Sequence, residues 1–295
     1  MIPPSRIVLS GGGIRAVAHA GALQALEEAG LLRAVKEYVG VSAGALIAFC
    51  VAIGYSIETV RNFSEKFDFS QIRNLEPDSM FEFLETFGVD NAARLRKFLE
   101  SLLKQRGVSP DCTFAEFYSQ NPSASHVRIF AADIFTCQPF EFSLAATPAA
   151  KLVDALHASM AIPGYFVPYR EPSANHYLVD GGALNNNPLA FLTPEEQKHA
   201  LSIGFSMDHV QVKEISSIGD YFHQVYACFF MPRHVSLVKQ HSDRVIIIPC
   251  GEYPMWDFEA EACVRREMIA KGYQAVREFL SMKRPSNGKR RFSVA

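Results

Sequence analysis

The sequence predicts an α/β fold built on a parallel sheet, and three observations near the N-terminus predict it. A short apolar run at residues 6–10 is typical of a buried strand, and an alanine-rich helical pattern follows from Ile14 to Ala29. A second apolar run, 38–41, leads straight into an apolar helical pattern from about Ala43. Strand, helix, strand and helix in this order predict a right-handed βαβ unit, whose parallel strands are expected to be neighbours.

The rest of the chain continues the alternation after one helical interruption. Residues 56–120 contain charged, amphipathic helical segments between turn signals, which predicts a helical excursion from the sheet and a candidate cap. The segments VRIFAADIF and QPFEFSL are expected to pair across a short turn. The further expected elements are a helix at 149–160, strands in HYLVD, HALSIGFS and RVIIIPC, and long helices at 216–231 and 259–282.

The composition is that of a globular protein without a marked charge bias. It is 48% hydrophobic, and 29 Lys and Arg nearly balance 31 Asp and Glu, so nucleic acid is not an expected partner. None of the six cysteines forms a CxxC pair, so we expect a reduced setting and no structural zinc site. No signal peptide is visible and the most apolar window, 41–53, is too short to span a bilayer, which predicts a cytoplasmic protein.

The pentapeptide GVSAG, residues 40–44, joins the second strand to the next helix and has the GxSxG pattern. Small residues around Ser42 let the chain make a sharp, strained turn that raises the serine Oγ above the sheet edge at a helix N-terminus. The motif alone occurs by chance, but a strand before it and an apolar helix after it are the context of a nucleophile. Ser42 is therefore the candidate nucleophile, and a plain tight turn is the competing interpretation.

The glycine run Gly11, Gly12 and Gly13 lies between the first strand and the first helix. Amides at a helix start can hold a cofactor phosphate or the oxyanion of an acyl transfer. A dinucleotide site also needs an acidic residue at the end of the second strand, and the Ser42 turn occupies that position. The oxyanion hole is therefore favoured. Arg15 either orients the site, bonds nearby carbonyls or is solvated.

Asp180 ends the apolar strand HYLVD and precedes two glycines, so its side chain is held rigidly and left sterically open. It is a candidate base for Ser42, with a turn-capping aspartate as the alternative. An isolated aspartate is a weak base with a pKa of about 3.9, so it must bond the Ser42 hydroxyl directly in a partly desolvated site. His157 and His176 are the nearest histidines, and neither has a spacing that ties it to Ser42.

An ordinary α/β-hydrolase does not fit, because those enzymes place several strands before the nucleophile and a histidine late in the chain. The motifs GGGIRA, GVSAG and DGG, in this order, resemble the patatin-like lipid acyl hydrolases. The block HASMAIPGYFVP at 157–168, Ala132-Asp133 and Asn187-Pro188 are also similar to that family. The resemblance covers most of the chain, and it departs at Ala16, where the family often has glycine.

The resemblance implies a three-layer α/β/α sandwich with a mostly parallel central sheet. Residues 1–282 would be the catalytic domain, with 56–120 as the helical excursion, and 283–295 would be a basic flexible tail. It also implies a Ser42–Asp180 dyad without a catalytic histidine, an oxyanion hole from the glycine run with Arg15 alongside, and no metal or other cofactor.

The implied reaction is cleavage of fatty-acyl esters of phospholipids or other acyl glycerolipids through an acyl-enzyme. The expected partner is lipid at a membrane or micelle surface, with peripheral membrane contact. The alternative is a lipid- or partner-binding module with a vestigial active site. The residues leave open the lipid headgroup, the acyl position and length, any activating partner and the oligomeric state.

Overall fold

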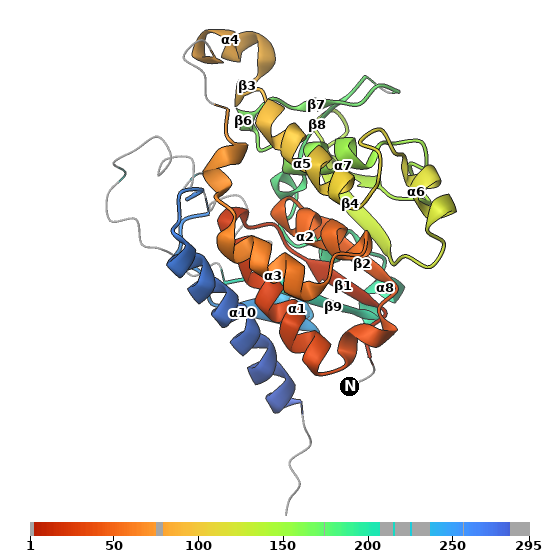
Figure 1. Ribbon diagram of the computed structural model, residues 1–295, viewed down its shortest axis with the longest axis vertical. Coiled ribbons are helices and arrows are strands. Elements are labelled where there is room, and N and C mark those ends of the chain that lie inside the picture. Colours follow the sequence, from red (N-terminus) through yellow and green to blue (C-terminus); the bar gives the residue numbers. More distant parts are fainter. Residues whose placement is uncertain are drawn as a thin grey trace, which may run out of the picture.

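The central sheet is mixed and carries the strand order β10-β9-β1-β2-β4-β8-β7, with β5 also paired to β4 (Figure 1). The computed structural model describes residues 3–74, 79–173, 175–206, 215, 225, 237–255 and 257–283. The strands are β1 (Arg6–Leu9), β2 (Glu37–Val41), β4 (His126–Asp133), β5 (Gln138–Phe142), β7 (Tyr169–Arg170), β8 (Tyr177–Asp180), β9 (Ala200–Phe205) and β10 (Val245–Ile248). Strands β10, β9, β1, β2 and β4 run parallel, whereas β5, β7 and β8 run antiparallel to their neighbours. The predicted α/β fold with a mostly parallel sheet is confirmed.

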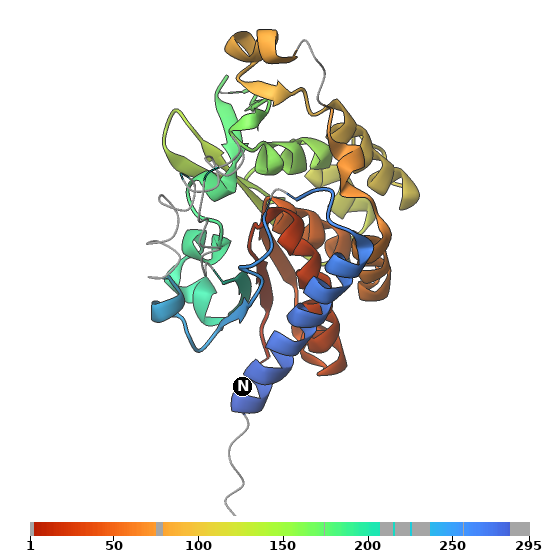
Figure 2. The ribbon, with the colours of Figure 1, turned by 90° about the vertical axis from the view of Figure 1, so that its left-hand side faces the viewer.

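Helices flank this sheet, and Figures 1 and 2 show α1, α2, α3 and α10 together on one side of it. The helices are α1 (Ala18–Glu28), α2 (Ala43–Ala52), α3 (Ile57–Lys66), α4 (Ser79–Thr86), α5 (Ala93–Gln105), α6 (Phe114–Gln120), α7 (Leu152–Met160), α8 (Pro194–Lys198) and α10 (Ala262–Met282). Successive side chains of β1 point to opposite faces of the sheet. Ile7 and Leu9 pack against the helices, while Val8 packs with Leu189 and Leu192 on the other face. Both faces of the sheet are therefore covered.

The first βαβ unit forms as predicted, with β1 and β2 adjacent and parallel and Leu9 opposite Gly40. The first helix differs from the expected span of 14–29, because a 3-10 turn over Gly13–Val17 precedes α1. In this turn the Arg15 N–H donates to Gly12 O at 3.2 Å, so the turn after the glycine run is wound more tightly than an α-helix.

The segment from 56 to 120 contains α3, α4, α5 and α6, and it also contains a short strand that the helical pattern did not predict. This strand, β3 (Gly88–Asp90), pairs in parallel with β6 (Gly164–Phe166) in a separate two-stranded sheet. The helix predicted at 216–231 and the basic tail beyond Lys283 lie outside the described residues. The helix predicted at 259–282 is α10.

Two glycines bring α1 and α10 into backbone contact. A Cβ added at Gly21 would overlap the carbonyl oxygen of Ile269, and a Cβ added at Gly272 would overlap that of Ala18. Glycine at both crossing points therefore sets the distance between the two helices.

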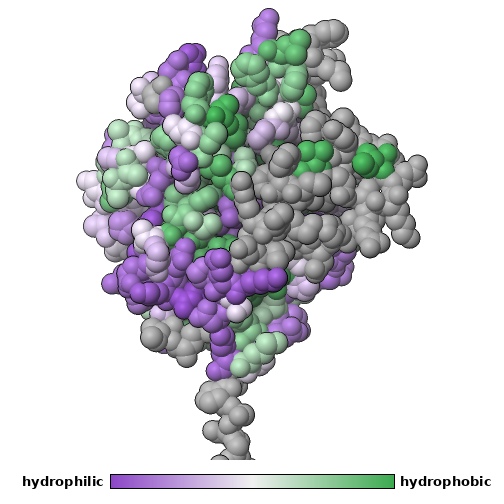
Figure 3. All heavy atoms as spheres, turned by 180° about the vertical axis from the view of Figure 1, so that it is seen from behind, coloured by the Kyte–Doolittle hydropathy of each residue, from purple (hydrophilic) through white to green (hydrophobic). Residues whose placement is uncertain are grey.

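An apolar cluster is exposed near α4, and Figure 3 shows apolar residues at that end of the molecule. Phe87 and Phe135 are 51% and 61% exposed, and both rings contact Tyr177, with centroid distances of 5.8 and 6.2 Å. Ile134 is 51% exposed beside Phe135. We call Phe87, Ile134, Phe135 and Tyr177 the exposed aromatic cluster. Among the described residues, no helix has the length and apolarity to cross a bilayer.

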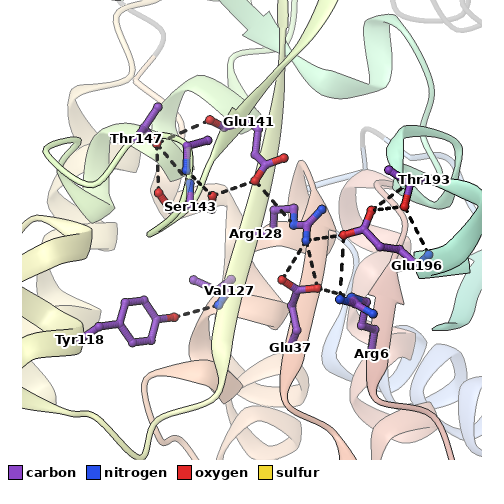
Figure 4. A network of polar contacts seen from close by, with 11 residues as sticks. Arg6, Glu37, Tyr118, Val127, Arg128, Glu141, Ser143, Thr147, Thr193 and Glu196 are labelled. Atoms are coloured by element: carbon purple, nitrogen blue, oxygen red, sulfur yellow. Dashed lines mark hydrogen bonds and ion pairs between the residues drawn. The ribbon is translucent and has the colours of Figure 1, made fainter. Parts of the chain in front are cut away.

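An ion-pair network ties β1, β2 and β4 to α8 (Figure 4). Arg128 on β4 lies 3.1 Å from a Glu37 oxygen and 2.8 Å from a Glu196 oxygen, and Arg6 bonds Glu37 at 2.5 Å. The Arg128 Nε is also 3.6 Å from Glu141. Burial by itself would raise the pKa of Glu196, but hydrogen bonds and charge from Arg128 hold it at about 2. Arg128 therefore neutralises carboxylates from three elements.

Replacing Arg128 with methionine is expected to lower the free energy of unfolding by about 2–3 kcal/mol at neutral pH, because partly buried carboxylates lose their counter-charge. Urea titration measures the loss. Because the pKa of Glu196 is depressed in the folded protein, its charge stabilises the fold above about pH 4.5, and this contribution is lost as the pH falls toward 2. The difference in free energy of unfolding between the native protein and Arg128→Met should therefore decrease over that range. Lys151→Met, which removes an exposed ion pair to Asp111, is the control, and an equal effect in both variants would contradict the network's role.

Candidate active site

Ser42 occupies a strained turn between β2 and α2. Its backbone angles are φ 55° and ψ −134°, a region that costs a non-glycine residue about 1–3 kcal/mol. A Cβ at Gly40 would overlap the backbone of Ala45, and a Cβ at Gly44 would overlap the carbonyl oxygens of Leu9 and Ser10. The two glycines of GxSxG therefore let the chain turn sharply against β1, with Ser42 at the start of α2.

Ser159 on α7 holds this turn in place. Its Oγ accepts the Ser42 N–H at 2.9 Å and donates to Phe130 O at 2.7 Å, and its side chain is fully buried. In the sequence, Ser159 stands out only as part of the block at 157–168, with no predicted role. A serine between Ala158 and Met160, near the end of α7, was the available signal, because a buried hydroxyl needs hydrogen-bond partners.

The topology of β4 brings Asp180 to Ser42. Strand β2 pairs with β4 up to Val41 opposite Phe130, and β8 pairs with β4 from Asp180 opposite Ala131. Strand β5 also pairs with that part of β4, so β2 and β8 share the opposite edge. Because β8 runs antiparallel to β4, its last residue meets the end of β2, and Ser42 follows at once.

The carboxyl of Asp180 is buried and bonded on both sides. It accepts a hydrogen bond from the Ser42 side chain and one from the Gly182 N–H at 2.7 Å, and its own N–H donates to Ala161 O at 2.8 Å. Burial raises the pKa of Asp180 to about 6, although both hydrogen bonds oppose the rise. The carboxylate is therefore a stronger base than a solvated aspartate and is still ionised at neutral pH.

The glycine run lies against Ser42, but one of its amides is already in use. A Cβ at Gly11 would come within 3.1 Å of the Ser42 Cβ, and the Gly11 N–H donates to Asn186 O at 2.9 Å. Gly11 thereby differs from the other two glycines predicted to form an oxyanion hole. Within the described part of the chain, no hydrogen bond takes up the N–H of Gly12 or Gly13.

Asn186 also joins the two glycine-rich motifs, which the sequence analysis did not foresee. Its Oδ1 would lie 2.8 Å from a Cβ at Gly11, and a Cβ at Gly182 would overlap it. The side chain therefore fits between the glycine run and the DGG turn only because both positions lack a Cβ. The polar run NNNP after DGG was the available signal.

Arg15 is buried and bonds carbonyls, one of the alternatives that the sequence left open. Its Nε donates to Tyr253 O at 2.6 Å and its Nη2 to Gly251 O at 3.0 Å, and the residue is 4% exposed. Burial lowers the pKa of the guanidinium. The Ile14 N–H adds a bond to Met255 O at 3.0 Å. Arg15 thus fastens the loop at 251–255 to the glycine run.

Neither candidate histidine contacts the dyad. His176 Nδ1 is 2.8 Å from Asp133 Oδ2, and its ring stacks on Phe135. His157 lies on α7, and burial lowers its pKa to about 4. No hydrogen bond among the described residues joins either one to Ser42 or Asp180.

An apolar pocket of about 100 Å³ opens beside Ser42. Leu46 and Cys50 on α2, Phe63 on α3 and Phe98 on α5 line it, and Gly13 lies at the same end as Ser42. Burial raises the pKa of the Cys50 thiol to about 12, so it stays neutral. The nucleophile candidate therefore lies between the glycine run and a space suited to a hydrocarbon chain.

The amino-acid sequence is similar to those of known lipid-cleaving proteins. The chain is 27% identical over 183 residues to a probable lipid hydrolase of Invertebrate iridescent virus 6, covering 62% of this chain and 61% of the viral one. It is 25% identical over 193 residues to a cGAMP-activated phospholipase of Escherichia coli (strain TW11681), covering 61% of this chain and 50% of that protein. The chain thus matches less than two thirds of either relative.

Solved structures share the fold at low sequence identity. VipD from Legionella pneumophila superposes with a TM-score of 0.63 at 17% identity, covering 95% of this chain and 67% of VipD. ExoU of Pseudomonas aeruginosa, in complex with SpcU, gives 0.52 at 17% identity, covering 94% and 53%. The family model of patatin-like phospholipase matches residues 7–193, well over half of the sequence. The chain belongs to the patatin-like phospholipase family.

Proposed function

We propose that this protein is a serine lipid acyl hydrolase that cleaves fatty-acyl esters of phospholipids or other acyl glycerolipids through a Ser42–Asp180 dyad. The observation that carries the proposal is the buried carboxyl of Asp180, bonded to the Ser42 side chain at the mouth of an apolar pocket. A nucleophile, a base of raised pKa and a space for an acyl chain meet at one sheet edge.

The proposed reaction has two steps. Ser42 Oγ attacks the ester carbonyl carbon while its proton passes to Asp180, and the N–H groups of Gly12 and Gly13 stabilise the oxyanion. The C–O bond to the leaving alcohol then breaks, and that oxygen takes the proton from Asp180. Water attacks the acyl-enzyme with Asp180 again as base, which releases the fatty acid and restores Ser42. No step uses a histidine, a metal or a cofactor.

The family and the names of its members support a lipid substrate. One relative is a probable lipid hydrolase and another a phospholipase. The exposed aromatic cluster fits contact with a lipid surface, since exposed apolar side chains grouped together mark interaction sites. The same cluster also fits the alternative of a lipid-binding module without catalysis, so the test must separate hydrolysis from binding.

The test combines a fluorophosphonate probe with a lipid panel. The probe is expected to label Ser42, identified by peptide mass spectrometry, and the protein should release fatty acid from phosphatidylcholine vesicles, lysophospholipid micelles or diacylglycerol emulsions. Ser42→Ala should lose both signals, while Ser125→Ala, in the loop before β4, should keep them. Labelling of another serine would refute the assignment. Vesicle binding with neither labelling nor release would favour the binding module.

A further inference from the structure

The apolar pocket follows α2 away from Ser42. Ser42, Leu46 and Cys50 line it at spacings of four residues, so they form one stripe along the helix. Eight residues at a rise of about 1.5 Å each make this stripe about 12 Å long. An extended alkyl chain advances about 1.25 Å per carbon, given C–C bonds of about 1.5 Å. An acyl chain of about ten carbons would therefore span the stripe.

The far end of the pocket is polar, in contrast to its walls. Tyr55 and Gln105 line it there, where α2 and α5 both end. The Tyr55 hydroxyl is 2.9 Å from Leu102 O and 3.3 Å from Gln105 Oε1. The Arg106 guanidinium lies 5.5 Å from the Tyr55 ring centroid and donates to Ile53 O at 3.3 Å. The Tyr55 side chain is thus held by contacts from the C-terminal end of α5.

We infer that Tyr55, with Gln105, ends the acyl-chain site and sets the acyl length that the protein prefers. This inference rests on the proposed function, since it assigns the pocket to the acyl group of the same substrate. Each methylene that enters the apolar part of the pocket raises the binding constant of the acyl chain about fourfold. A longer chain must displace the bonded tyrosine hydroxyl or extend into water, so the gain stops at the polar end.

Esters of p-nitrophenol with acyl chains of about four to sixteen carbons test the inference through kcat/KM. The native protein is expected to prefer about ten carbons. Tyr55→Ala should raise the ratio of kcat/KM for the sixteen-carbon ester to that for the ten-carbon ester about tenfold or more. Tyr55→Phe keeps the ring and loses the hydroxyl, so its ratio should fall between those of the native protein and Tyr55→Ala.

Cys50→Phe provides the opposite change, because it fills the pocket before its end and should move the preference to shorter chains. It also keeps the inference testable if Tyr55→Ala does not fold. Tyr273→Ala, which removes a partly exposed tyrosine on α10 that bonds Glu28 and does not line this pocket, is the matched control and should leave the ratio unchanged. An active protein with the same length profile in all variants would overturn the inference alone. A native protein that cleaves no ester would instead refute the proposed function.

Discussion

Asp180→Asn is expected to abolish ester cleavage and, at the same time, to stabilise the folded protein at neutral pH. Loss of the base should lower kcat by about 10²–10⁴-fold, because asparagine cannot take the Ser42 proton. Asparagine keeps the size of the side chain, and its Oδ1 can still accept the Gly182 N–H. The fold should therefore survive while the chemistry is lost.

The gain in stability follows from the direction of the pKa shift. The pKa of Asp180 is about 6 in the folded protein, above the ordinary aspartate value of 3.8, because burial disfavours the charged form. The folded state therefore holds the proton more tightly, and the native protein loses stability as the pH rises from about 4 to 6. Removing the charge should add about 3 kcal/mol above pH 6, and the difference should vanish below pH 4.

Thermal or urea unfolding of both proteins at a series of pH values measures this difference, and initial rates on one ester measure the activity. The native kcat/KM should rise with pH with an apparent pKa near 6, as Asp180 loses its proton. Full activity in Asp180→Asn would exclude this residue as the base. Equal free energies of unfolding of the two proteins at neutral pH would show that the buried carboxylate does not destabilise the folded protein.

Gly272→Ala is expected to destabilise the protein by about 3 kcal/mol or more, although alanine favours a helix over glycine by about 1 kcal/mol. The new methyl group would overlap the carbonyl oxygen of Ala18, a backbone atom that no rotamer change can move. Helices α1 and α10 would have to separate. Gly21→Ala should have a similar effect, since its methyl group would overlap Ile269 O.

Urea titration with Gln274→Ala as control separates packing from helix propensity. Gln274 lies on the exposed side of α10, two residues from Gly272, so its replacement should change stability by no more than about 0.5 kcal/mol. If Gly272→Ala were as stable as the control, the close crossing of α1 and α10 would not be a source of stability.

Local features of the site could be predicted from the sequence. The turn at Ser42 needs small residues at 40 and 44, and GVSAG shows them directly. Strand, glycine run and helix also follow one another along the chain, so the neighbouring positions of β1 and β2 could be expected from the βαβ pattern. The strand β3 could not, because three residues carry too little periodicity to distinguish a strand from a turn.

Long-range features depended on the tertiary structure. The sequence alone determined that Ser42, Asp180 and the glycine run end buried strands, because backbone sterics and hydrophobic alternation act within a few residues. Only the fold decided that Ser42 and Asp180 meet, since this depends on β2 and β8 sharing one edge of β4. The fold also decided that Asn186 occupies the Gly11 amide and that Arg15 bonds carbonyls near residue 252. Strand register and helix packing determine which residues remote in sequence become hydrogen-bond partners, and neither can be predicted from a local sequence pattern.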